Sequence, residues 1–171
     1  KLLQYTPAMT FGITGSDGKT TTTTLTGKFL SETAKTYVGG NIGTPLMDKC
    51  AEMTDGDRVV LELSSFQLMN MPNISPNHMD WHIDEEEYAN AKYNIVGENT
   101  KRLIVNAACK QTFDFGMKIL DESDKEVFFF SSKRNSYNSV IGEKNARAKL
   151  FFVDDGFICV SDGEGIEQIL A

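Results

Sequence analysis

Glycines, hydroxyl side chains and a lysine come together in the segment from Gly12 to Thr20, which reads GITGSDGKT. The segment follows a short apolar run from Met9 to Ile13 and opens a stretch long enough for a helix. It therefore predicts a strand, a glycine-rich turn and a helix N-terminus. Unpaired backbone N–H groups at such a helix start favour an anion. In this arrangement Lys19 would reach the β- and γ-phosphates of a nucleotide, and the hydroxyl of Thr20 would hold Mg²⁺.

A nucleotide bound there would contact the turn and the start of the helix. The strict Walker A spacing requires a glycine at position 13, where this chain has Ile13, and Gly12 lies one place early. A turn that contains a lysine by chance is the alternative, and the junction of strand and helix argues against it. The predicted nucleotide-binding residues are Thr14, Gly15, Ser16, Asp17, Gly18, Lys19, Thr20 and Thr21.

A second candidate is Glu62, which lies near the end of a strand predicted from Arg58 to Leu63. The apolar run before it is continuous rather than alternating, which is typical of a central strand in a parallel sheet. In P-loop proteins a carboxylate at the carboxyl end of such a strand lies beside the phosphate loop and holds Mg²⁺. A glutamate with a purely structural partner is the alternative.

Both histidines of the chain, His78 and His82, precede a helix that we expect to begin after an Asp84 N-cap and to continue to about Glu98. A proline before His78 favours strand or loop there, so the helical spacing that would pair the histidines on a metal is not assured. Each histidine could instead be a satisfied hydrogen-bonding residue. Lys92 lies about two turns into the helix.

The elements that must position these residues alternate between strand and helix, which predicts an α/β fold. We expect a mostly parallel sheet flanked by helices, in the manner of P-loop NTPases, with a small antiparallel β addition near the C-terminus. The predicted strands are 9–13, 35–38, 58–63, 102–105 and 126–130, with a hairpin of 150–153 and 157–160 and a short closing element at 163–171. The predicted helices are 19–32, 45–53, 84–98 and 109–120, and 131–149 is predicted to be a solvated loop.

Composition narrows the class of protein. The chain has 171 residues, of which 40% are hydrophobic, and we expect a single domain. A formal net charge of −7 argues against nucleic acid or an anionic membrane as a partner, and no apolar run is long enough to span a bilayer. Three widely spaced cysteines without a C-x-x-C pair predict a reducing compartment, the cytoplasm, and no zinc site.

The motifs resemble those of the ATP-dependent Mur ligases. The phosphate loop of that family has the form G-x-T-G-[ST]-x-G-K-[ST], and this chain matches it at every position. The segment GNIG around Asn41 is by itself a tight turn, but it resembles the D-glutamate-adding member, as does the string ELSSFQL that starts at Glu62. The resemblance implies that Asn41, Ser64 and Gln67 contact the muramoyl substrate.

The string from Asn73 to Asp80, followed by E-Y-x-x-A-K, also matches the family pattern. The resemblance implies that His78 binds a second Mg²⁺ and that Lys92 is carbamylated, so that its new carboxylate helps to hold the same ion. It implies a role for Asp80 in orienting this loop. The catalytic residues would then be Lys19, His78 and Lys92, and the metal ligands Thr20, Glu62, His78 and Lys92.

The resemblance implies that residues 1–171 are the central ATP-binding domain of a monomeric enzyme. That enzyme would use ATP and two Mg²⁺ ions to add D-glutamate to UDP-N-acetylmuramoyl-L-alanine through an acyl phosphate, in peptidoglycan precursor synthesis. The family's N-terminal UDP-binding domain and its C-terminal domain do not occur in this sequence, so the fragment is expected to be inactive alone. Two alternatives remain: another Mur-type or folylpolyglutamate-type amide ligase, and a non-catalytic nucleotide-binding module.

Overall fold

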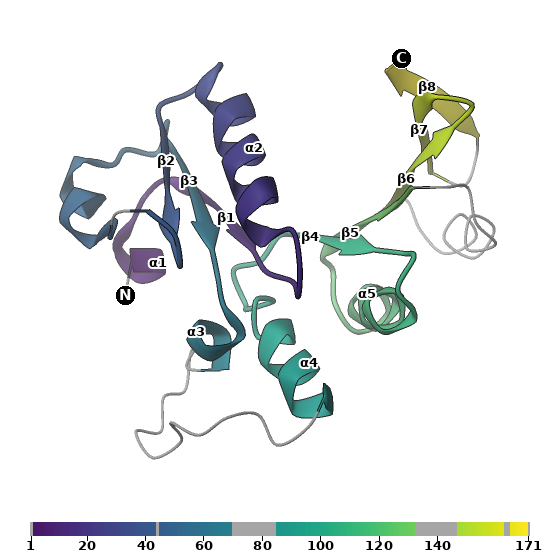
Figure 1. The fold of residues 1–171 in the computed structure, drawn as a ribbon, viewed down its shortest axis with the longest axis horizontal. Helices are drawn as coiled ribbons and strands as arrows, with labels where there is room; N and C mark the ends of the chain where they lie inside the picture. Colours follow the sequence, from purple (N-terminus) through teal and green to yellow (C-terminus); the bar gives the residue numbers. More distant parts are fainter. Residues whose placement is uncertain (1, 44, 70–84, 133–146, 163–164, 171) are drawn as a thin grey trace. The chain divides into compact units, whose positions relative to one another are not determined.

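The structure is a computed structural model that describes residues 2–43, 45–69, 85–132, 147–162 and 165–170 (Figure 1). The chain divides into two compact units, Lys1–Ile95 and Val96–Ala171. Each unit has its own sheet and its own hydrophobic core. No helix in the described ranges is long and apolar enough to cross a membrane. All three cysteines are free thiols.

The first unit is built on a parallel sheet of three strands, ordered β1-β3-β2. Its central strand β3 is buried from Val59 to Glu62, which explains the continuous apolar run in the sequence. The long helix α2 packs against all three strands and begins at the end of the sheet where β1 finishes (Figure 1). The elements of this unit are α1 (Leu2–Tyr5), β1 (Met9–Ile13), α2 (Lys19–Ser31), β2 (Thr36–Gly40), the 3₁₀-helix η1 (Met47–Glu52), β3 (Arg58–Glu62), α3 (Ser65–Met69) and α4 (Glu85–Tyr93).

The strands and α2 lie close to their predicted bounds, whereas two helical predictions were wrong and two short helices were missed. The helix expected over 45–53 is a 3₁₀-helix of six residues, held by the burial of Leu46 and Met53 in the core. The helix expected to reach Glu98 ends at Tyr93, where Asn94 turns its side-chain amide to the carbonyl oxygen of Leu68. The short helices α1 and α3 were not predicted at all.

The second unit has a five-stranded sheet in which β4, β5 and β6 are parallel and β7 and β8 are antiparallel additions. Helix α5 packs against β4 and β5 (Figure 1). Thus the α/β class and the antiparallel addition near the C-terminus are confirmed. The elements are β4 (Arg102–Asn106), α5 (Lys110–Glu122), β5 (Glu126–Ser131), β6 (Ala148–Asp154), β7 (Phe157–Ser161) and β8 (Ile166–Leu170).

The predicted hairpin is the antiparallel pair of β6 and β7. Its turn places Asp155 at φ 47° and Gly156 at φ 82°, and positive φ at both central residues is the requirement of a tight two-residue hairpin turn. The predicted loop over 131–149 was too long at its end, because β6 already begins at Ala148. Residues 133–146 lie outside the described part of the chain.

A substitution in the threonine run of α2 tests how this helix packs against the sheet. Thr23 is fully buried, and its Oγ1 has no hydrogen-bond partner among the described residues. Thr23→Val keeps the shape of the side chain and removes a desolvated, unpaired hydroxyl, so it should raise the free energy of unfolding by about 1 kcal/mol. Urea denaturation measures the change, with Thr22→Val at the exposed neighbouring position as the control. A loss of stability in Thr23→Val alone would contradict the absence of a partner.

Candidate nucleotide and metal site

The phosphate loop lies where the sequence predicts it, between the end of β1 at Ile13 and the start of α2 at Lys19. Gly18 occupies the N-cap position with φ 74°, in the left-handed region that favours glycine. Gly18 has no side chain that could cap the helix, so the first backbone N–H groups of α2 can donate hydrogen bonds to an anion. The helix dipole also favours a negative charge at this end. The start of α2 therefore has the form of a phosphate site.

Lys19 folds back over this loop. Its Nζ donates hydrogen bonds to the carbonyl oxygens of Gly15 and Ser16, each at 3.0 Å. The ammonium group is thus held on the loop that would carry the phosphates, as the motif predicts.

Thr14, the first loop residue, has a buried hydroxyl without a hydrogen-bond partner among the described residues. The side chains of Ser16, Asp17, Thr20 and Thr21 are exposed. The predicted nucleotide-binding residues therefore leave polar groups for a ligand.

Glu62 lies beside the loop because of the strand order. Sheet register places it opposite Ile13 of β1 on one side and Gly40 of β2 on the other. Its side chain is almost fully buried, at 2% exposure, and both carboxylate oxygens accept hydrogen bonds. Thr20 Oγ1 donates to Oε2 at 2.8 Å, and Asn41 Nδ2 donates to Oε1 at 3.3 Å. Two residues predicted separately as metal ligands, Thr20 and Glu62, are thus in direct contact.

The donor set of this contact fits Mg²⁺. Hydroxyl and carboxylate oxygens are the hard ligands that the ion prefers. Within the described ranges Glu62 forms no ion pair, and its buried carboxylate is bonded there to the neutral side chains of Thr20 and Asn41. No cluster of three or more His, Cys, Asp or Glu side chains that could hold a metal ion occurs in the same ranges.

Lys92 of α4 also reaches the loop. Its Nζ donates a hydrogen bond to Ser16 Oγ at 2.9 Å, across 76 positions of the sequence. The structure therefore places Lys92 beside the loop that is predicted to bind phosphate. His78, together with the rest of 70–84, lies outside the described residues.

Ser64 and Gln67 bond to each other at the start of α3. The Ser64 N–H donates to Gln67 Oε1 at 2.8 Å, and the Gln67 N–H donates to Ser64 Oγ at 3.2 Å. This reciprocal pair is a capping box, whose S-x-x-Q signature was present in the sequence but was interpreted there only as a substrate motif. The pair explains why the unpredicted helix α3 forms directly after β3.

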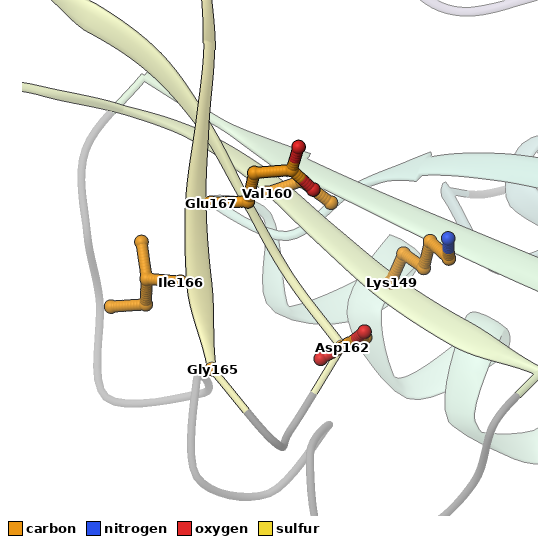
Figure 2. Close-up of a pocket in the computed structure, with 6 residues that line it drawn as sticks. All are labelled: Lys149, Val160, Asp162, Gly165, Ile166 and Glu167. Carbon is orange, nitrogen blue, oxygen red and sulfur yellow. The ribbon is translucent and has the colours of Figure 1, made fainter.

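The second unit holds none of the predicted site residues. Asn106, the last residue of β4, accepts a hydrogen bond at its Oδ1 from the N–H of Ala108 at 2.9 Å and so caps the local turn. A hollow of about 320 Å³ lies at the β8 end of the sheet, where Ile166 and Glu167 point to opposite sides of the strand (Figure 2). It is lined by Lys149, Val160, Asp162, Gly165, Ile166 and Glu167.

Comparison with known proteins decides the family. Residues 13–163 match the Mur ligase middle domain. The chain belongs to the Mur ligase family. This confirms the resemblance that the motifs indicated, and it makes the loop, Thr20 and Glu62 part of a Mur ligase middle domain.

Several relatives carry the name UDP-N-acetylmuramoylalanine--D-glutamate ligase. That of Clostridium botulinum (strain Alaska E43 / Type E3) is 49% identical over 146 residues, which cover 78% of this chain and 31% of the relative. That of Clostridium acetobutylicum is 53% identical over 118 residues, 62% of this chain and 26% of the relative. That of Clostridium beijerinckii is 42% identical over 174 residues, 95% of this chain and 36% of the relative. The chain thus spans about a third of the length of these relatives.

Proposed function

We propose that this Mur ligase middle domain is the ATP-binding part of a cytoplasmic ligase that adds D-glutamate to UDP-N-acetylmuramoyl-L-alanine in peptidoglycan precursor synthesis. The contact of Thr20 with the buried Glu62 carries the proposal, because it brings together two hard oxygen donors, which would suit Mg²⁺, at the start of α2. The names of the relatives, at 42–53% identity, support the choice of D-glutamate as acceptor.

The proposed reaction has two steps. The substrate carboxylate attacks the γ-phosphorus of ATP, the bond to ADP breaks, and an acyl phosphate forms. The amine of D-glutamate then attacks the acyl carbon, loses a proton and expels phosphate, which leaves an amide. Lys19 and the N–H groups of α2 would neutralise charge on the transferring phosphoryl group. Mg²⁺, held by Thr20 and Glu62, would supply further charge neutralisation at the β- and γ-phosphates.

We also propose a second Mg²⁺ held by His78 and a carbamylated Lys92. The position of Lys92 supports this part, because its Nζ already lies 2.9 Å from Ser16 Oγ on the phosphate loop. An unmodified ammonium would repel the ion, whereas a carbamate supplies oxygen ligands of the right charge. Ser64, which follows β3, and Gln67 of α3 are proposed to contact the muramoyl substrate.

An assay that compares four amino acids as acceptors tests the proposal. ADP release by the full-length protein is measured with ATP, Mg²⁺ and UDP-N-acetylmuramoyl-L-alanine, with D-glutamate, L-glutamate, L-lysine or diaminopimelate as the added amino acid. We expect D-glutamate to be preferred at least about 100-fold in kcat/KM, because an acceptor site that bonds the two carboxylates of the D-isomer is left with unpaired polar groups by an analogue that lacks one of them or places them differently about the amine.

Two outcomes of that assay would contradict the proposal. Preference for another amino acid would indicate a different amide ligase, as would ADP release with L-glutamate when a folate replaces UDP-N-acetylmuramoyl-L-alanine in the same assay. Nucleotide binding without acceptor-dependent ADP release under any of these conditions would indicate a non-catalytic module.

A further inference from the structure

We infer that Asn41 is a positioning residue, which orients the carboxylate of Glu62 for the cation. The inference rests on the proposed function, because Glu62 is a cation ligand only there. The family resemblance connects Asn41 with the muramoyl substrate, whereas its contacts in the structure are with Glu62. The two roles make different predictions for metal binding.

Each carboxylate oxygen of Glu62 accepts a hydrogen bond from a different side chain. Oε2 faces the hydroxyl of Thr20 at 2.8 Å, and Oε1 faces the amide of Asn41 at 3.3 Å. In the described ranges no other side chain donates to Oε1. Removal of the amide would leave a buried acceptor unpaired and would free the carboxylate to rotate away from Thr20. Asn41 therefore fixes the plane of the carboxylate, so that one of its two equivalent oxygens faces Thr20.

The backbone of Asn41 is itself held in place by Glu62. Its side chain is exposed, so packing does not hold it. Instead its backbone N–H donates to the carbonyl oxygen of Glu62 at 2.8 Å. The preceding residue, Gly40, has φ 105°, and a Cβ there would lie 2.2 Å from the same Glu62 oxygen. Only glycine permits this close approach. As a result, Asn41 forms hydrogen bonds with both the main chain and the side chain of Glu62.

The contribution of Asn41 to cation affinity can be estimated from the geometry of its hydrogen bond to Glu62. Partners that orient a metal ligand without touching the metal typically contribute about 10- to 100-fold to metal affinity. The distance of 3.3 Å for the Asn41 bond, between neutral amide and carboxylate, places it at the lower end of that range. Loss of the bond should therefore weaken cation binding about tenfold.

Mn²⁺ titration of the full-length protein in the presence of ADP tests the inference, with free Mn²⁺ measured by electron paramagnetic resonance. Asn41→Ala should raise the Kd of Mn²⁺ about tenfold. Thr36→Ala is the matched control, because it deletes another side-chain hydrogen bond of β2, from Thr36 to the carbonyl oxygen of Ala34, at the opposite end of the strand. It should leave the Kd unchanged. ADP binding in EDTA should be equal in all variants, which shows that the phosphate loop is intact.

Glu62→Gln separates a failure of this inference from a failure of the proposed function. If Glu62→Gln loses Mn²⁺ binding while Asn41→Ala binds like the unmodified protein, the positioning role is wrong and the cation site stands. If Glu62→Gln binds Mn²⁺ normally, the cation site itself is wrong, and the inference fails with it. Normal Mn²⁺ binding by Asn41→Ala with a raised KM for UDP-N-acetylmuramoyl-L-alanine would assign Asn41 to the substrate instead.

Discussion

Lys19→Ala should lower the kcat of the full-length protein about 10³-fold, measured as acceptor-dependent ADP release at saturating ATP. Lys19 is the ammonium that the loop holds against the carbonyl oxygens of Gly15 and Ser16. The charge on the phosphoryl group is greatest during transfer, so the loss should appear in kcat rather than only in the KM for ATP. Alanine removes that charge without adding bulk to the loop.

Lys28→Ala is the matched control for this experiment. Lys28 lies in the last turn of the same helix, α2, and is exposed, so its removal changes the net charge equally but not the phosphate site. Its kcat should remain within about twofold of the unmodified protein, since exposed charges contribute little at a distance. Near-normal turnover in Lys19→Ala would contradict the assignment of the phosphate loop.

Glu62→Gln should act in opposite directions on activity and on stability. The carboxylate is buried at 2% exposure and bonded only to neutral groups, Thr20 and Asn41, in the described structure. Glutamine keeps the shape and can pair with both, since its oxygen accepts from Asn41 and its amide donates to Thr20. Without Mg²⁺ the free energy of unfolding should rise by about 1 kcal/mol, because an uncompensated buried charge is removed.

With ATP and Mg²⁺ the same variant should lose at least about 100-fold in kcat, because the cation loses its charged ligand. Urea denaturation in EDTA and ADP release measure the two effects. Glu52→Gln is the control: this glutamate is exposed and pairs with Lys49 at 3.3 Å, so it should change stability by less than about 0.5 kcal/mol. Destabilisation by Glu62→Gln without Mg²⁺ would show that the carboxylate is already compensated.

Local sequence patterns predicted those turns, strands and helices whose conformation depends only on a few neighbouring residues. The strand, glycine turn and helix from Met9 to Ser31 form a contiguous motif, in which Gly18 adopts a positive φ of 74° directly before the helix. The hairpin around Asp155 and Gly156 is equally local. The burial of β3 followed from its unbroken apolar run, because only a strand covered on both faces tolerates one.

Helix ends and short helices were predicted less well, because single side-chain hydrogen bonds, some of them to distant residues, decide them. The Ser64 and Gln67 side chains start α3 by capping each other, although the same residues had been interpreted only as substrate contacts. At Tyr93 helix α4 stops although the sequence offers no proline or glycine there, since Asn94 bonds to Leu68 of α3. The partner is 26 positions away, so no local pattern could reveal it.

The sequence by itself determined the chemical groups of this Mur ligase domain: a phosphate loop, a lysine, a hydroxyl and an acid at the end of a buried strand. Tertiary structure alone decided which of them meet. Thr20 and Asn41 reach Glu62 across 42 and 21 positions because β3 inserts between β1 and β2, an order that differs from the order along the chain. Parallel pairing aligns the carboxyl ends of the three strands, and that alignment brings the acid, the hydroxyl and the amide into one site.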